Sequence, residues 1–291
     1  SYEADILVIT TGGNAYSHTG STWDGYAFAR SLGHSVTQLW PSLSSFLTRE
    51  NWLHALSGLS FPSAKVSLSF SVGESLSGIP NDRKRSSAIA KDDKRADLTW
   101  PLLLTHFGIS WPLAFMTSSA LAWDHISPAH AKIIHLSPLS DMDTLKWETF
   151  LKEQFSLHPK KLITNILAEK LPRRFTEAFV LEYFSHIRET FASSISKKDR
   201  EKIAELLGSG IPLTLLERRP GDEFVTAWGV STDELDPETM ESKIHNNLYF
   251  AGEVLNVDGY TGGFSLQICW ASGYSSGKEI VRKLAQEEKS I

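Results

Sequence analysis

The stretch "LYFAGEVLNVDGYTGGF", residues 248–264, decides how the chain is interpreted. Its apolar start predicts a buried strand that ends at Gly252, and its end opens a long helical pattern. Glu253 therefore follows a strand at its carboxyl end, where open α/β sheets bind their ligands. Its carboxylate can accept hydrogen bonds from the hydroxyls of a ribose or ribityl chain. Backbone N–H groups of the following glycines can face an anionic or electron-rich group, with the helix N-terminus behind them: Gly259, Gly262 and Gly263. The alternative is a surface loop rich in turn residues.

A second strand–turn–helix pattern lies at the other end of the sequence. Residues 4–10, "ADILVIT", predict a buried strand that runs into a tight turn at Gly12 and Gly13. Apolar residues at helical spacing follow and end at Gly33, a candidate helix cap. Gly12, Gly13 and Gly20 either hold a second part of the same ligand or form only a hairpin or helix-entry turn. The pattern is typical of a nucleotide-binding α/β layer.

The sequence between these two ends changes character twice. Residues 36–140 and 211–239 contain strand-like alternation and predict a β-rich domain, and residues 141–210 contain amphipathic helical patterns that predict a helical subdomain. The charged segment 81–97 is predicted to be a hairpin tip or a loose loop. We therefore expect an α/β protein in which residues 1–35 and 240–291 form one discontinuous nucleotide-binding domain. Because the chain starts at Ser1, directly at a strand, we expect that this domain lacks its N-terminal part.

Composition limits the classes of partner. The net charge of −5 disfavours a nucleic acid or an anionic membrane as the main partner. The only cysteine, Cys269, excludes an internal disulfide or a CxxC redox pair, so a reducing cytoplasm is expected. No apolar run is long enough to cross a bilayer, and no signal peptide is visible. We expect a cytoplasmic protein that binds a small molecule and holds no metal.

No catalytic residue can be assigned from the sequence. His106 lies in an apolar run and is interpreted as a core residue, with a catalytic role as the weaker alternative. The spacing of His125, His130 and His135 fits neither one helix face nor a usual metal site, so these are interpreted as structural. Cys269 lies in the apolar segment "LQICWAS" and is interpreted as a small buried residue.

Four stretches resemble the bacterial aminoacetone-oxidase-like family of FAD-dependent flavoproteins. They are "TTGGNAYSHTGSTWDGYAFARSLGH", "PLLLTHFGISWP", "VTAWGVSTDELDPETMESK" and "LYFAGEVLNVDGYTGGFSLQICWASGYSSG", in the family's order over nearly the whole chain. The resemblance implies a glutathione-reductase-type FAD domain with an inserted β-barrel-like domain and a helical subdomain. It also implies an oxidoreductase that oxidises or reduces a small organic substrate through FAD, with NAD(P)H as a candidate electron donor.

The resemblance also implies roles for ten residues. Thr11, Gly12 and Gly13 would lie along the dinucleotide part of FAD, and Gly252 and Glu253 would meet its ribityl-phosphate region. The residues that would approach the flavin ring are Asp258, Gly259, Gly262, Gly263 and Phe264.

The family's N-terminal G-x-G-x-x-G turn is absent from this sequence. The chain is therefore interpreted as an N-terminally truncated fragment that is inactive by itself. The alternative is a noncatalytic or split-protein half that binds a nucleotide only together with a partner chain.

Four tryptophans depart from the family pattern. Glycine stands in the family where this chain has Trp23, Trp100, Trp111 and Trp228. Glycine serves turns that need a positive φ or a close backbone approach, and an indole there adds both a Cβ and bulk. Some uncultivated bacterial lineages read the codon UGA as glycine, whereas the usual recoding tables give tryptophan. We therefore hypothesise that these four residues are glycines in the living protein.

Overall fold

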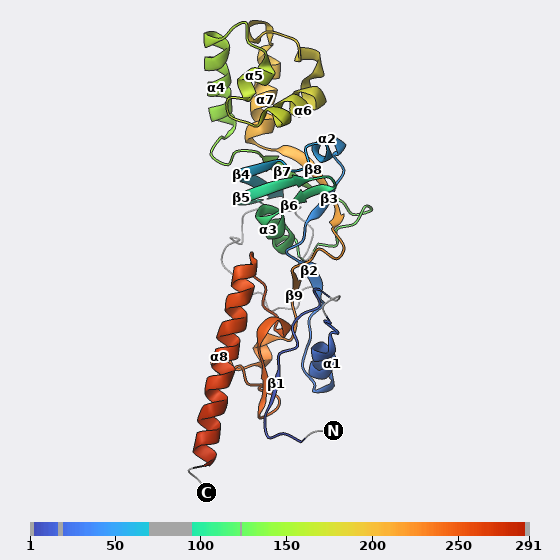
Figure 1. Ribbon diagram of the computed structural model, residues 1–291, viewed down its shortest axis with the longest axis vertical. Helices are drawn as coiled ribbons and strands as arrows, with labels where there is room; N and C mark the ends of the chain where they lie inside the picture. Colours follow the sequence, from blue (N-terminus) through green and yellow to red (C-terminus); the bar gives the residue numbers. More distant parts are fainter. Residues whose placement is uncertain (1–2, 17–19, 70–94, 123, 289–291) are drawn as a thin grey trace. The chain divides into compact units, whose positions relative to one another are not determined.

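The computed structural model describes residues 3–16, 20–69, 95–122 and 124–288 (Figure 1). Most of the segment 81–97 lies outside these residues, and its last three residues begin a strand. The chain divides into two compact units. Unit 1 comprises Ser1–Ser45, Phe115–His125 and Arg218–Ile291, and unit 2 comprises Phe46–Ala114 and Ile126–Glu217.

Unit 2 is built on a closed six-stranded barrel. The strands follow one another around it in the order β3 (Phe46–Thr48), β6 (Gly108–Ser110), β5 (Arg95–Thr105), β4 (Ser60–Ser69), β7 (Lys132–Ser137) and β8 (Ile211–Arg218). Ala64, Val66 and Leu68 alternate along β4 and are fully or almost fully buried. This period of two is the strand signal of the sequence "AKVSLSF". The predicted mixed α/β class with a β-barrel is confirmed at this level.

Four helices of unit 2 gather beside one end of the barrel (Figure 1). They are α4 (Thr144–Leu157), α5 (Ile163–Leu167), α6 (Arg173–Phe184) and α7 (Lys197–Gly208). Their starts follow from capping, because Asp143 accepts the N–H of Lys146 at 2.8 Å and Ser196 accepts that of Asp199 at 3.1 Å. Trp147 is fully buried in their core. The predicted helices in this region are confirmed. The remaining short helices of unit 2 are α2 (Asn51–His54), η2 (Ser185–Ile187) and η3 (Ala192–Ser194).

Unit 1 contains two separate two-stranded sheets. β1 (Leu7–Ile9) pairs in parallel with β10 (Leu248–Phe250), and β2 (Trp40–Ser42) pairs antiparallel with β9 (Val225–Ala227). Its helical elements are α1 (Asp24–Ser31), η4 (Thr232–Glu234), η5 (Gly252–Val254) and α8 (Gly262–Glu287). The apolar core joins the parallel sheet to α1 and to the chain around η4 and η5: Ile9, Tyr26, Ala29, Val230, Leu235, Leu248, Phe250, Val254 and Leu255.

Helix α1 ends where the sequence predicts. Gly33 has φ 80°, and the N–H of His34 donates to the carbonyl of Ala29 at 2.9 Å. This is the left-handed glycine cap that satisfies the last carbonyls of a helix.

A buried arginine closes helix α3 (Pro112–Ala120) of the chain. The Arg218 guanidinium donates to the Ser118 hydroxyl and to the carbonyls of Leu121 and Asp124. Burial lowers the pKa of Arg218 to about 10, which leaves it charged at neutral pH. A cation at the end of a helix stabilises the carbonyls that lack helical partners.

No helix in the described part of the chain combines the length and the apolar character needed to span a membrane.

Candidate functional site

The carboxyl ends of β1 and β10 lie at the same edge of their parallel sheet. Ile9 and Phe250 are paired as the last residues of the two strands, and the N–H of Ala251 donates to the carbonyl of Ile9 at 3.2 Å. The segments 10–13 and 251–253 therefore leave the sheet side by side. This is the edge at which open α/β sheets bind ligands.

Gly13 packs directly against Glu253. A Cβ built on Gly13 would lie 2.5 Å from Glu253 Oε1 and 2.7 Å from Thr226 Oγ1, so only glycine fits there. The N–H of Thr226 donates to Glu253 Oε1 at 2.8 Å, and the Thr226 hydroxyl accepts the N–H groups of Asn14 and Ala15. One threonine thus joins the glycine turn to the carboxylate.

The Glu253 carboxyl group has a raised pKa. Burial raises the pKa of Glu253, the nearby negative charge of Asp258 raises it further, and the hydrogen bond from the Thr226 N–H opposes both. Perturbed carboxylates of this kind gather at functional sites, although structural networks produce them too.

Asp258 fixes the loop between η5 and α8. Its Oδ2 accepts hydrogen bonds from Ser42 Oγ at 3.1 Å and Ser119 Oγ at 3.2 Å. These hydroxyls come from two segments of unit 1 that lie far from Asp258 in the sequence. The carboxylate therefore holds the start of the glycine-rich loop in one place.

The glycines of this loop have different surroundings. A Cβ on Gly259 would lie 2.5 Å from Phe264 Cβ, so these two residues pack closely. A Cβ on Gly262 would meet nothing within 4 Å, and one on Gly263 would meet only Thr261 Oγ1 at 3.8 Å. Open space therefore adjoins the N-terminus of α8.

Helix α8 is attached to this edge through Gly252. The N–H of Gly252 donates to Ser272 Oγ at 3.0 Å, and Gly252 has φ 84°. Cys269 lies beside it, and burial followed by the charge of Glu253 raises the pKa of the thiol. A thiol with a raised pKa is a poor nucleophile at neutral pH.

The structure brings most of the predicted residues together in unit 1. Gly13 lies against Glu253, and Gly252 and Glu253 adjoin α8, with Gly259 packed on Phe264 at its start. Gly12 and Gly20 have open surroundings. Thr11 instead packs against Gly25 of α1. A Cβ added to Gly25 would clash with the Thr11 hydroxyl.

Sequence reasoning missed three hydroxyl residues of the site: Ser42, Ser119 and Thr226. Each is a single serine or threonine in a chain rich in them, and only the fold shows which ones meet Glu253 and Asp258. No local pattern could have found them.

The interpretation of His106 as a core residue is wrong. His106 is exposed in the turn between β5 and β6 of unit 2, where the Thr105 hydroxyl accepts the N–H of Gly108 at 3.1 Å. An exposed turn gives this imidazole no buried partner, so the apolar residues around it belong to the flanking strands. Among the residues that the structure describes, no three His, Cys, Asp or Glu side chains are grouped as metal ligands would be.

Comparison with known proteins decides the family. The family model described as the HI0933-like protein Rossmann domain matches residues 1–279. The chain belongs to the HI0933-like family. This is an FAD-dependent, Rossmann-type family of oxidoreductases.

Three curated proteins resemble this HI0933-like chain. A 3-dehydro-bile acid delta(4,6)-reductase of Clostridium scindens is 28% identical over 292 residues, which cover 97% of the chain and 63% of the reductase. A ribosomal RNA dihydrouridine synthase of Escherichia coli is 27% identical over 278 residues, covering 94% of the chain and 60% of the synthase. The ribosomal RNA dihydrouridine synthase of Haemophilus influenzae is 28% identical over 286 residues, which cover 97% of the chain and 62% of that synthase. The chain thus spans less than two thirds of the length of these relatives.

Proposed function

We propose that the chain belongs to an FAD-dependent oxidoreductase of a small organic substrate, and that Glu253 and the loop 259–263 form one wall of its flavin site. The observation that carries this proposal is the contact between Gly13 and the partly buried Glu253 carboxylate at the shared carboxyl edge of β1 and β10. An α/β sheet offers its ligands this edge, and the family binds FAD.

The surroundings of the glycines fit a bulky planar ligand. Gly262 and Gly263 adjoin open space at the N-terminus of α8, and neither carries a side chain that would fill it. In contrast, Gly13 and Gly259 are packed against side chains and serve to close the wall. Backbone N–H groups at the start of a long helix favour an electron-rich or anionic group.

Each residue of the wall has a separate task in this proposal. Glu253 orients a ribityl or ribose hydroxyl by accepting its hydrogen bond. Asp258, held by Ser42 and Ser119, fixes the position of the loop, and Phe264 packs against Gly259 of that loop. Bound FAD would supply the redox chemistry, and the residues of the wall would hold and orient it.

The proposal also includes a class of substrate and an electron donor. The aminoacetone-oxidase-like pattern of the sequence supports a small organic substrate, and NAD(P)H is the candidate donor. The net charge of −5 gives no support to a polyanionic substrate such as the ribosomal RNA in the names of two relatives.

A second candidate is a noncatalytic half that binds a nucleotide only with a partner chain. Two observations favour it: the sequence contains no G-x-G-x-x-G turn, and the chain spans 60–63% of its three relatives. A missing pyrophosphate turn predicts that the chain loses FAD during purification in either case.

Titration of FAD, followed by quenching of flavin fluorescence, tests the proposal. We expect weak, saturable binding to the purified chain, and at least a roughly tenfold loss in Gly262→Leu, whose side chain would enter the open space. Gly273→Leu is the matched control, because Gly273 also lies in α8 with nothing within 4 Å of an added Cβ.

The outcomes separate the two candidates. Saturable binding that Gly262→Leu weakens and Gly273→Leu does not supports the flavin wall and removes the need for a partner chain. Equal binding by both variants contradicts the wall. Absence of any saturable binding to the chain favours the second candidate, and consumption of NADPH by the FAD-loaded chain excludes it.

A further inference from the structure

Helix α8 carries its apolar side chains on the outward face. Leu266, Trp270, Tyr274, Val281 and Leu284 are all exposed, with Trp270 at 65% and Tyr274 at 72%. Their spacing of three, four and seven residues places them in one stripe along the helix. We call these five residues the α8 stripe.

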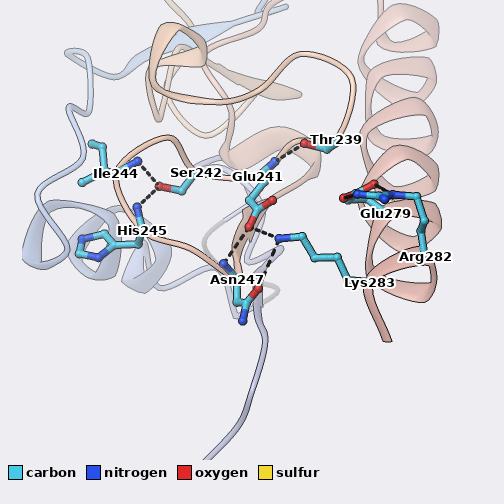
Figure 2. A network of polar contacts seen from close by, with 9 residues as sticks. All are labelled: Thr239, Glu241, Ser242, Ile244, His245, Asn247, Glu279, Arg282 and Lys283. Carbon is cyan, nitrogen blue, oxygen red and sulfur yellow. Dashed lines mark hydrogen bonds and ion pairs between the residues drawn. The ribbon is translucent and has the colours of Figure 1, made fainter. Parts of the chain in front are cut away.

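The opposite face of α8 is small and polar, and it is the face that packs on unit 1. Ser272 and Ser276 are 5% and 2% exposed, and Ser272 binds the N–H of Gly252. Farther along, Lys283 Nζ donates to Glu241 Oε1 at 2.5 Å and lies 3.4 Å from Asn247 Oδ1 (Figure 2). A surface helix normally buries its apolar face and exposes its polar one, so α8 has the opposite arrangement.

The parallel sheet beside α8 has only two strands, fewer than parallel sheets usually have. β1 exposes Leu7 and Val8, and among the described strands β1 pairs only with β10. The other edge of β10 is occupied, because Tyr249 forms an antiparallel bridge with Glu241. Parallel strands occur almost only in sheets that are covered on both faces and extended by further strands. Unit 1 therefore presents both an open strand edge and an uncovered apolar helix.

We propose that the α8 stripe and the β1 edge are the docking surface for the rest of a Rossmann-type domain. The occupant is the part of the relatives' length that this chain does not match, in the same polypeptide or as a separate one. Two observations identify it: the family model is a Rossmann domain, and the chain spans only 60–63% of the three relatives. A parallel strand of this occupant would pair with the open edge of β1, and an apolar helix would cover the α8 stripe. This inference needs no bound flavin.

Co-purification tests the docking surface. The residues of each of the three relatives outside the matched part are expressed with the tagged chain, and the ratio of the two polypeptides is measured. We expect at least one segment to co-purify in a one-to-one ratio, and the double variant Trp270→Glu/Tyr274→Glu to lose at least roughly 90% of it. The double variant Ala271→Glu/Lys278→Glu, off the stripe on the same helix, should retain it.

Light scattering and circular dichroism complete the experiment. The stripe is exposed, so both double variants should keep the helix content and Tm of the parent chain. The proposal is overturned if no segment binds, or if the stripe variant binds as well as the parent. It is also overturned if the parent is a defined dimer that the stripe variant converts to a monomer, because a second copy would then be the occupant.

A different observation concerns three of the tryptophans. Trp23, Trp111 and Trp228 have φ of 65°, 75° and 74°, the left-handed region that side chains with a Cβ avoid. Tryptophan makes up nine of 291 residues, but it supplies three of the seven described non-glycine residues with positive φ. Trp100 differs, because it lies within β5 opposite Ala64 and is absent from this group.

We infer that the backbone is built for glycine at positions 23, 111 and 228, and that the protein carries glycine there in its own cells. Trp23 and Trp111 immediately precede helices α1 and α3, where a left-handed residue turns the chain into the helix. Trp228 is buried beside Gly229, at which an added Cβ would lie 2.2 Å from the Val254 carbonyl oxygen. The backbone at Trp100 has no such requirement.

The codons and the protein mass decide this inference. UGA codons at the three positions, and glycine masses in peptides of the protein from its native cells, are the expected results. UGG codons or tryptophan masses at these positions overturn it.

Stability provides an independent measurement. Trp23→Gly and Trp111→Gly should each raise Tm by roughly 2–4 °C, because both side chains are about half exposed and their removal relieves strain. Trp100→Gly is the control and should lower Tm, since glycine weakens a strand. A fall of Tm in all three variants contradicts the inference.

Discussion

Unit 2 and unit 1 differ in whether their strands have open edges. The six strands of unit 2 close into a barrel, whereas the strands of unit 1 form two separate pairs. A closed barrel leaves no edge that needs a partner, but a two-stranded sheet alone is marginal in water. The strands of unit 2 therefore leave no open edge, whereas β1 of unit 1 has one. Unit 1 is also where we propose the flavin wall and the docking surface.

The largest predicted effect lies in the helical core of unit 2. Trp147→Ala removes a fully buried indole and should lower the free energy of unfolding of unit 2 by about 3–5 kcal/mol. Trp270→Ala, in the α8 stripe, is the contrast and should change stability by less than about 0.5 kcal/mol. Urea titration with hydrogen exchange read separately in each unit measures both. Equal losses for the two variants would remove the distinction between a closed core and an uncovered face.

The next effect tests how unit 1 is held together. Arg218→Met keeps the length of the side chain but removes the guanidinium hydrogen bonds to Ser118, Leu121 and Asp124. The loss of charged hydrogen bonds to buried acceptors should destabilise unit 1 by about 2–3 kcal/mol. Arg219→Met is the matched neighbour and should cost less. Hydrogen exchange in residues 115–122, at the end of α3 and just beyond it, reports the change. Unchanged exchange there would show that the guanidinium does not hold the helix end.

A smaller effect is expected at the glycine turn. Gly13→Ala forces a Cβ against Glu253 and Thr226 and should destabilise unit 1 by about 1–3 kcal/mol. Gly262→Ala adds the same methyl group to open space and should leave stability nearly unchanged. Chemical unfolding of the two variants measures the difference. A destabilised Gly262→Ala beside a neutral Gly13→Ala would reverse the assignment of packed and open glycines.

The smallest effect depends on pH. Because burial raises the pKa of Glu253 in the folded protein, the folded state holds its proton more tightly than the unfolded chain, whose Glu pKa is about 4.3. This contribution to stability is fully present below the unfolded pKa and is lost as pH rises through the folded pKa. Glu253→Gln should therefore match the parent in acid and become the more stable of the two toward neutral pH. A difference that stays constant with pH would show that the carboxyl does not titrate as described.

The sequence predicted the elements better than their assembly. Alternation around Val66 and capping at Ser196 are local signals, and the barrel strand and the helix that they predict are both present. The glycine cap of α1 was equally readable, because a left-handed residue is a local requirement. The barrel was expected only from the family resemblance, because its closure depends on pairing between strands far apart in the chain and leaves no local signal.

The sequence predicted only those site residues that lie close to the end of a predicted strand. Glu253 was found because it comes right after β10, whereas Thr226 and Ser119 reach the site through tertiary folding. His106 was misplaced because an apolar flanking sequence does not distinguish a core position from a turn between two buried strands. The roles of these residues toward FAD stay predictions.

Hydrogen exchange of the chain with and without saturating FAD tests the flavin wall most directly. FAD should slow exchange in residues 10–13 and 252–264 of unit 1 and leave exchange in the barrel strands of unit 2 unchanged. Protection confined to unit 2, or protection in unit 1 that avoids both segments, would contradict the placement of the flavin against Glu253 and Gly262.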